Sequence, residues 1–314
     1  MRIVFMGTPD FSVPTLEALV RSEHQVVGVF TQPDKQKGRG QKLQPTPVKA
    51  AALEAGIPVF QPVRIRNREA LDQVRALAPD LVVVVAFGQI LPKELLEMPP
   101  YGCVNVHASL LPKYRGAGPI QWCLLNGEKE TGLTTMRMDE GLDTGDMLLK
   151  VSVPIREKET GGSLHDRLSG LGGDLLLETI RRLEEGTLAG TPQNPADATY
   201  APLLTKDMGA IDWSLEGERI DWLVRGLDPW PGAYTWLEGK LLKVWDVEVS
   251  EEGFDQDPGT VVAVDPKKGF QVACGNNTTL WVKEVQLQGK KRMPCDVFLR
   301  GVRLPAGMTL PPRG

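Results

Sequence analysis

The chain has 314 residues, of which 41% are hydrophobic and 24% charged, and its net charge is −4. This length predicts two domains, and this composition is typical of an ordinary globular protein. Because no apolar run approaches the roughly 18 residues that a membrane-spanning helix needs, we expect no membrane partner. The negative net charge on its own argues against a nucleic-acid partner, but the local distribution of charge matters more than the sum.

Targeting signals and paired cysteines are both missing from the sequence. The N-terminus begins directly with the strand-like segment Arg2–Met6 and offers neither a signal peptide nor a transit peptide. Cys103, Cys123, Cys274 and Cys295 are scattered, with no Cys-x-x-Cys pair. We therefore expect a cytoplasmic protein with free thiols. No His/Cys cluster has metal-ligand spacing, so we expect no metal.

The first half of the chain alternates strand-like and helix-like segments, which is typical of βαβ units. Thr46 and Pro47 resemble a helix start, and Gly56 the end of that helix; Asn67 is expected to cap another helix. The clearest predicted strands, in chain order, are Arg2–Met6, Gln25–Thr31, Leu81–Val85, Gly102–His107, Thr131–Met138 and Met147–Val153. This pattern predicts a doubly wound, mostly parallel α/β domain of the Rossmann-like class.

A long helix from Ser163 to about Glu185 completes this domain, which we predict over residues 1–188. Residues 189–206 are rich in Gly, Pro, Ala and Asn without a period, so we predict a linker there. A short helix near Glu216–Arg225 and several short strands then predict a small β-barrel over residues 207–314. These strands are Lys240–Val249, Gly259–Val264, Gly269–Ala273 and Thr279–Leu287.

Two polar side chains lie on the strand that precedes Ala108. The strand alternates Val104 and Val106 with Asn105 and His107, so a carboxamide and an imidazole project from the same face. Burying a polar side chain costs free energy unless it makes hydrogen bonds, so two such side chains on a buried strand indicate a ligand or a polar partner at that position. Together they can polarise a carbonyl and move protons. The alternatives are a structural histidine and an amide that caps the following turn.

About thirty residues later, a glycine-rich loop carries Asp139, Asp143 and Asp146. One of these carboxylates could reach the imidazole and hold its tautomer. The residues alone do not choose among the three, because an aspartate in a loop bounded by glycines is commonly a turn former.

These motifs resemble the folate-dependent formyltransferase family, whose pattern is Asn-x-His, an adjacent Ser-Leu-Leu-Pro and a later Asp-Thr-Gly-Asp loop. Further segments are similar to the branch of the family that acts on methionyl-tRNA, and the resemblance covers nearly the whole chain. The matching segments are Val4–Phe11, Thr31–Asp34, Gly38–Gly40, Asn105–His107, Ser109–Pro112, Asp143–Asp146, Ile211–Ser214 and Asp228–Pro231.

The resemblance implies an enzyme that transfers the formyl group of 10-formyltetrahydrofolate, a co-substrate, to the α-amine of initiator methionyl-tRNA for translation initiation. It also implies an OB-like topology for the C-terminal barrel, and we expect a monomer. Asn105, His107 and Asp143 are the implied catalytic residues. The implied folate-binding residues are Ser109, Leu110, Leu111 and Pro112, with Phe87, Gly88 and Leu91 as the facing wall.

Two basic segments stand out from the acidic background, and they predict local phosphate contacts with tRNA better than non-specific binding. One runs from Asp34 to Lys49 and the other from Lys283 to Arg303. An ordinary solvated surface is the alternative for each. The candidate tRNA-binding residues are Arg39, Lys42, Lys290, Lys291 and Arg292.

Other functions remain open from the sequence. A formyltransferase for a sugar nucleotide or a purine-pathway amine, and a hydrolase that releases formate from formyltetrahydrofolate, would use the same central motif. The hydrolase would not need a C-terminal tRNA module, and a pure RNA-binding protein would leave Asn105, His107 and Asp143 without a role. The first strand is not followed by Gly-x-Gly-x-x-Gly, which argues against an NAD site.

Overall fold

A computed structural model describes residues 1–37, 42–250 and 252–311. Their contacts form two compact units. Unit 1 contains residues 1–119, 130–154 and 165–201, and unit 2 contains residues 120–129, 155–164 and the described residues from Pro202 onwards. Two short segments that the sequence analysis assigned to the first domain thus belong to unit 2, and residues 189–201 of the predicted linker belong to unit 1.

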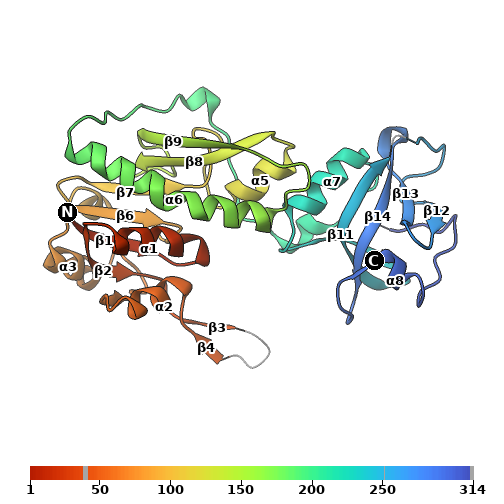
Figure 1. The fold of residues 1–314 in the computed structure, drawn as a ribbon, viewed down its shortest axis with the longest axis horizontal. Coiled ribbons are helices and arrows are strands. Elements are labelled where there is room, and N and C mark those ends of the chain that lie inside the picture. Colours follow the sequence, from red (N-terminus) through yellow and green to blue (C-terminus); the bar gives the residue numbers. More distant parts are fainter. Residues whose placement is uncertain (38–41, 251, 312–314) are drawn as a thin grey trace. The chain divides into compact units, whose positions relative to one another are not determined.

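Unit 1 is built on a seven-stranded sheet with the order β5-β2-β1-β6-β7-β8-β9 (Figure 1). Its first five strands are parallel, and β8 and β9 are antiparallel. The mostly parallel, Rossmann-like sheet is therefore confirmed. The strands are β1 (Arg2–Gly7), β2 (Gln25–Phe30), β5 (Val59–Phe60), β6 (Leu81–Val85), β7 (Cys103–His107), β8 (Glu130–Arg137) and β9 (Met147–Pro154).

Helices pack on both faces of this sheet because alternate side chains of each buried strand are apolar in both directions. On one face, Val82 and Val84 of β6 join a cluster with Leu71 and Val74 of α3. On the other face, α6 passes close to Val106 of β7. The helices of unit 1 are α1 (Val13–Arg21), α2 (Pro47–Glu54), α3 (Arg68–Leu77), α4 (Lys93–Leu96) and most of α6 (Gly161–Glu184), with short turns η1 (Asp10–Ser12) and η2 (Pro195–Asp197).

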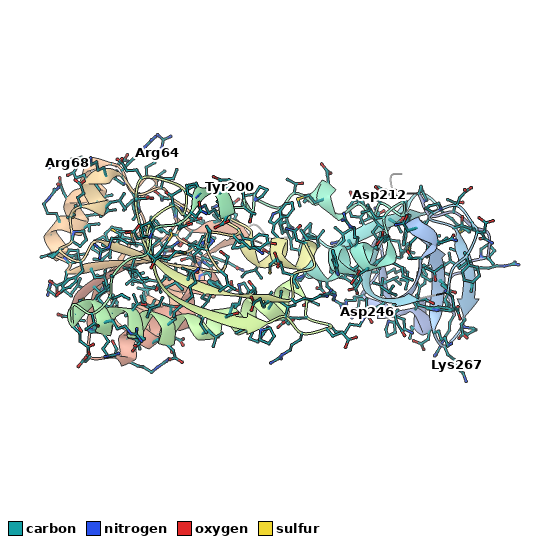
Figure 2. The ribbon with its side chains drawn as sticks, turned by 90° about the horizontal axis from the view of Figure 1, so that it is seen from above. Arg64, Arg68, Tyr200, Asp212, Asp246 and Lys267 are labelled. Carbon is teal, nitrogen blue, oxygen red and sulfur yellow. The ribbon has the colours of Figure 1, made fainter. Side chains whose placement is uncertain are left out.

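The two helix starts predicted from the sequence differ in detail. Thr46 precedes α2 and its side-chain oxygen accepts a hydrogen bond from the Lys49 amide at 3.1 Å, as expected for an N-cap. Asn67 also stands at the N-cap position, before α3, but its side chain makes no capping hydrogen bond. Arg64 and Arg68 project from the surface around this helix start (Figure 2).

Unit 2 contains an antiparallel sheet with the order β10-β11-β14-β13-β12, and β15 pairs with β14. Pairing between β10 and β12, which would close a barrel, does not occur among the described residues, so the OB-like barrel stays a prediction. The strands are β10 (Ala233–Leu237), β11 (Lys240–Ser250), β12 (Val261–Asp265), β13 (Gly269–Ala273), β14 (Thr279–Leu287) and β15 (Met293–Pro294). The helices are α5 (Pro119–Leu125), α7 (Gly217–Gly226) and α8 (Cys295–Phe298), with turns η3 (Lys206–Gly209) and η4 (Gly275–Asn277).

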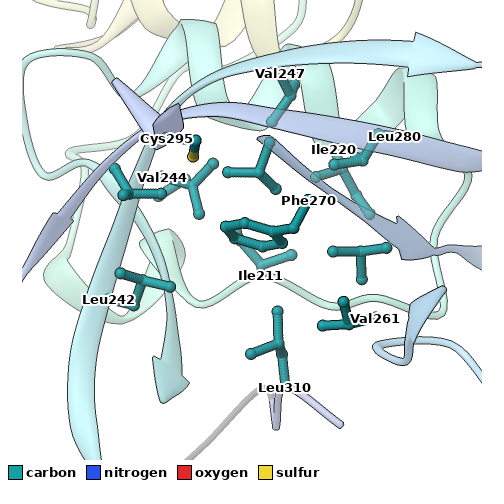
Figure 3. Close-up of a cluster of buried hydrophobic side chains, with 14 of the residues drawn as sticks. Ile211, Ile220, Leu242, Val244, Val247, Val261, Phe270, Leu280, Cys295 and Leu310 are labelled. Atoms are coloured by element: carbon teal, nitrogen blue, oxygen red, sulfur yellow. The ribbon is translucent and has the colours of Figure 1, made fainter. Parts of the chain in front are cut away.

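The core of unit 2 forms where the inner face of this sheet meets α7 and the segment that precedes it (Figure 3). Phe270 lies at its centre, with Ile211 and Ile220 from outside the sheet packed beside it. All seven tryptophans of the chain, from Trp122 to Trp281, belong to unit 2.

All four cysteines are free, as predicted from the sequence, and all four are buried. Burial raises the pKa of the Cys103, Cys274 and Cys295 thiols to about 12. Within the described part of the chain, no helix is both long and apolar enough to span a membrane.

Two glycines of α6 provide a matched test of how this helix packs. A Cβ at Gly170 would meet nothing within 4 Å, whereas a Cβ at Gly173 would lie 2.5 Å from the Ala18 Cβ of α1. We expect Gly170→Ala to stabilise the protein by up to about 1 kcal/mol, because alanine favours a helix. We expect Gly173→Ala to destabilise it by about 1–3 kcal/mol through overpacking.

Urea unfolding followed by circular dichroism measures both changes. Equal effects of the two substitutions would contradict the close packing of α1 against α6.

Candidate active site

The site lies where β7 ends. Cys103, Asn105 and His107 alternate along β7 and so share one face, while Val106 points to the opposite face, towards α6. Cys103 packs into the hydrophobic cluster on its face. Further along the strand, the apolar side chains give way to Asn105 and His107, which are 8% and 6% exposed. Their position at the carboxyl end of a strand is where open α/β sheets bind ligands.

The imidazole of His107 is oriented by a main-chain carbonyl. Its Nε2 atom lies 2.9 Å from the carbonyl oxygen of Tyr114. A carbonyl can only accept, so Nε2 must carry a hydrogen and donate it. In the neutral ring, Nδ1 is then the free base, and Nδ1 lies 3.7 Å from Oδ2 of Asp143. A proton gained at Nδ1 would be held between the ring and a carboxylate.

Of the three aspartates in the glycine-rich loop, Asp143 is the one beside this imidazole. Its Oδ2 also accepts a hydrogen bond from the Gly116 amide at 2.8 Å. Asp143 has a left-handed backbone with φ 53°, which aspartate tolerates better than most residues. Asp139 instead forms a local turn, accepting from Gly141 N and Thr144 Oγ1, and Asp146 is exposed.

The carboxamide of Asn105 is available to a ligand. It is nearly buried, yet it makes no side-chain hydrogen bond within the described residues. The amide is not one of the fully buried polar atoms that lack a partner, so it remains accessible to a polar ligand. The NH₂ group is a donor that could face a carbonyl oxygen.

The turn after β7 is held by a network of side-chain hydrogen bonds. Thr134 Oγ1 donates to the Ser109 carbonyl at 2.7 Å and accepts from the Leu111 amide at 3.1 Å. Lys150 Nζ donates to the Leu111 carbonyl at 2.5 Å, and its burial lowers the pKa of this ammonium. Ser109 and Leu111 are buried, so Leu110 and Pro112 offer most of the accessible surface of this turn.

The wall proposed to face that turn is partly internal. Phe87 and Leu91 are 1% and 3% exposed and belong to the hydrophobic core of unit 1. Gly88, with φ 81°, is exposed, and its carbonyl oxygen accepts a hydrogen bond from Gln32 Nε2 at 3.2 Å. Ile90 is 83% exposed, and so it is a better candidate for ligand contact than its buried neighbours. The sequence placed Ile90 in the segment Phe87–Leu91 but did not single it out, because a sequence gives no direct sign of which apolar side chain is exposed.

The predicted tRNA-binding residues divide into three groups. Arg39 lies outside the described residues, and of Lys42 only the backbone is described; it pairs with Lys37 where β3 (Lys35–Lys37) meets β4 (Lys42–Gln44). Lys290 and Lys291 are exposed in the turn after β14.

Arg292 has structural partners instead. Its guanidinium lies 2.6 Å from Glu284 and 3.1 Å from Asp228, and it stacks 4.8 Å from the ring centroid of Trp245. The hydrogen bond with Glu284 helps to raise the pKa of this guanidinium above its ordinary value. Two carboxylates thus offset its charge.

A buried Asn-x-His pair beside an aspartate, on a Rossmann-like sheet followed by an antiparallel β unit, is the arrangement expected of a formyl-transferring enzyme. Residues 1–180 match the family model described as formyl transferase, and residues 203–303 match the model of its C-terminal domain. The chain belongs to the formyl transferase family.

Within this family, the chain is similar to proteins named methionyl-tRNA formyltransferase. The chain is 55% identical over 310 residues to a methionyl-tRNA formyltransferase of Geobacter metallireducens, covering 99% of this chain and 98% of the relative. It is 54% identical over 307 residues to a methionyl-tRNA formyltransferase of Citrifermentans bemidjiense, covering 98% and 95%. An N-formyltransferase of Helicobacter canadensis shares the fold, with a TM-score of 0.65 and 18% identity over 90% of this chain and 98% of that one.

The tautomer of His107 follows from its contacts and can be measured. We expect the neutral ring to carry its hydrogen on Nε2, because the Tyr114 carbonyl requires a donor. Nitrogen-15 NMR of labelled histidine distinguishes the two tautomers. The chain has three histidines, so the His107 signals are assigned by their loss in His107→Gln. A hydrogen on Nδ1 in the neutral ring would contradict this geometry.

Proposed function

We propose that this chain transfers the formyl group of 10-formyltetrahydrofolate to the α-amine of methionyl-tRNA, giving formylmethionyl-tRNA. The observation that carries the proposal is the free Asn105 amide two residues before an imidazole that faces Asp143 across 3.7 Å. Identity of 54% and 55%, over 98% and 99% of this chain, to two enzymes named methionyl-tRNA formyltransferase supports the choice of amine.

The reaction needs charge stabilisation and one proton transfer. The amine nitrogen attacks the formyl carbon, a new C–N bond forms, and the carbonyl oxygen gains negative charge. The bond from the formyl carbon to N10 of the folate then breaks. The attacking amine loses one proton and N10 gains one, so no covalent intermediate with the protein is required.

Each residue of the trio suits one part of this reaction. The Asn105 NH₂ group would donate to the formyl oxygen as its charge develops. His107 would hold or move a proton at Nδ1, because Nε2 is engaged with Tyr114. Asp143 would stabilise the imidazolium and keep it facing the substrate. Donors prepositioned at a developing oxyanion typically contribute a factor of ~10²–10³ each.

The folate would occupy the space beside the turn after β7. Leu110 and Pro112 offer apolar surface there, and Gly88, which has no side chain, would let a flat pterin ring approach closely.

The amine-bearing end of the tRNA would enter from the β1 side of the sheet. A cavity of about 220 Å³ lies where β1 and β2 end, lined by Thr8, Gln32, Lys35 and Thr46 among others. Strands β1 and β7 both pair with β6, so this cavity and the trio lie at the same carboxyl edge of the sheet.

The proposal is tested by formyl transfer to methionyl-tRNA, measured beside formate release in water and transfer to free amines. We expect methionyl-tRNA to be the preferred acceptor. Asn105→Ala and His107→Ala should each lower the turnover rate at least ~10²-fold while the fold survives, because both groups act on developing charge.

His24→Gln is the matched control. The side chain of His24 is also only 6% exposed, but His24 precedes β2 at the amino end of the sheet, at the opposite edge from the carboxyl ends that form the site. If water or a free amine proved the better acceptor of the formyl group, the proposed function would be wrong. Normal turnover in a folded His107→Ala protein would remove His107 from the mechanism.

Phosphate contacts in unit 2 are tested through salt dependence. We expect replacing Lys290 and Lys291 by alanine to weaken tRNA binding and to reduce its log–log salt slope by up to about 0.9 for each lost contact. Arg292→Ala should mainly destabilise unit 2, since it would leave Asp228 and Glu284 unpaired. Binding of formyltetrahydrofolate should not change in the lysine variant.

Alanine at Lys267 and Lys268, an exposed lysine pair in another turn of unit 2, is the control for this experiment. If the two lysine-pair variants reduced the salt slope of tRNA binding equally, the attraction would be a general effect of charge. That result would contradict a specific phosphate contact at Lys290 and Lys291. Arg39→Ala should act differently and lower single-turnover formylation, because its loop is proposed to position the amine.

A further inference from the structure

Residues 191–201, part of the predicted linker, form a strap with the short turn η2 in its middle, and this strap bonds the loops that hold the catalytic trio. At one end Thr191 pairs with Met147 through two main-chain hydrogen bonds of 2.9 and 2.8 Å. At the other end Ala201 N donates to the Arg115 carbonyl at 2.7 Å, and Arg115 N donates to the Thr199 carbonyl at 2.8 Å. The strap therefore joins the aspartate loop to the segment that orients His107.

Gln193 lies in the strap and bonds the aspartate loop directly. Its Nε2 donates to the carbonyl oxygens of Asp143 and Gly145, both at 2.8 Å. Two carbonyl acceptors require the NH₂ group of the amide, which fixes the orientation of the side chain. Asp143 has an unusual left-handed backbone, and these bonds hold the loop in that conformation.

Arg115 holds Gln193 from the other side. Its Nε and Nη2 atoms donate to Gln193 Oε1 at 3.0 and 2.8 Å. Arg115 is only 5% exposed, and no carboxylate of the described residues forms an ion pair with it. Burying the charged guanidinium of Arg115 against a neutral amide costs folding free energy. Stability alone therefore does not explain why an arginine occupies this position.

The same segment approaches Asp143 from the imidazole side. Gly116, next to Arg115, donates its amide to Asp143 Oδ2, and a Cβ at Gly116 would lie 2.8 Å from the Ala201 carbonyl oxygen of the strap. Asp143 is thus bonded through its carbonyl by Gln193 and through its carboxylate by Gly116. Both partners depend on the strap.

From these contacts we infer that Gln193, held by Arg115, is a positioning residue that sets the distance between Asp143 and His107. The inference rests on the proposed function, because that function gives the distance its importance. Gln193 does not touch the trio's reacting atoms; it acts through the backbone of Asp143. Since a displacement of about 1 Å can cost ~10²-fold in rate, loosening this loop should lower turnover more than substrate binding.

Gln193→Met keeps the length of the side chain and removes its donors. We expect its turnover rate with methionyl-tRNA to fall roughly 10- to 100-fold, with KM for both substrates nearly unchanged and a shifted pH profile. Asn194→Ala is the matched control: Asn194 is the next residue of the strap, and its exposed side chain bonds only Ala196 and Asp197. It should retain the wild-type profile.

The decisive measurement is a double-mutant cycle with Asp143→Asn. If Gln193 acts through Asp143, adding Gln193→Met to Asp143→Asn should change the rate by less than about 2-fold, since the two effects are not independent. Should Gln193→Met fail to fold, Gln193→Glu carries the same test, because it keeps the acceptor towards Arg115 but repels both carbonyls. Independent multiplication of the two effects, or a normal rate and pH profile in the Gln193 variant, would overturn the inference. Failure of the wild-type protein to formylate methionyl-tRNA would instead overturn the proposed function.

Discussion

The hydrogen bond between His107 Nε2 and the Tyr114 carbonyl is the contact on which the proposed chemistry depends. By engaging one ring nitrogen with a group that can only accept, it assigns the other nitrogen to proton exchange. It also makes the turn after β7 part of the site, because the carbonyl must stay in place. The network around Ser109 and Thr134 and the pairing of residues 191–201 with Arg115 both stabilise that turn.

The architecture separates rigid support from reactive groups. The parallel strands β1, β6 and β7 are apolar on both faces and end at one edge, where the polar residues begin. Loops from distant parts of the sequence meet at that edge and bond one another rather than the strands alone. The turn after β7, the loop that carries Asp143 and residues 191–201 together orient Asp143 and His107. No single helix or strand therefore determines the geometry of this pair.

The sequence predicted the sheet well because its signals are local. The run Leu81–Val85 and the alternation through Asn105 and His107 depend only on neighbouring residues, and both strands were found where expected. The choice of Asp143 came from family resemblance, since turn-forming aspartates look alike in sequence. The pairing of residues 191–201 was not predictable, because strand-like bridges in a Gly- and Pro-containing segment depend on distant partners. Strand β10 was missed for a similar reason, as its pairing with β11 outweighs its short, mixed sequence.

The uneven distribution of tryptophan and cysteine between the units has a practical consequence. Because every indole belongs to unit 2, selectively excited tryptophan fluorescence reports during denaturation on that unit and not on the sheet that carries the trio. Cys103 fills this gap: its thiol is buried in unit 1 with a pKa of about 12, so an alkylating reagent reaches a reactive thiolate there only after the sheet opens. The other three cysteines belong to unit 2, so the labelling must be resolved by residue. Tryptophan fluorescence and the labelling of Cys103, followed side by side, then give separate unfolding curves for the two units without any introduced probe.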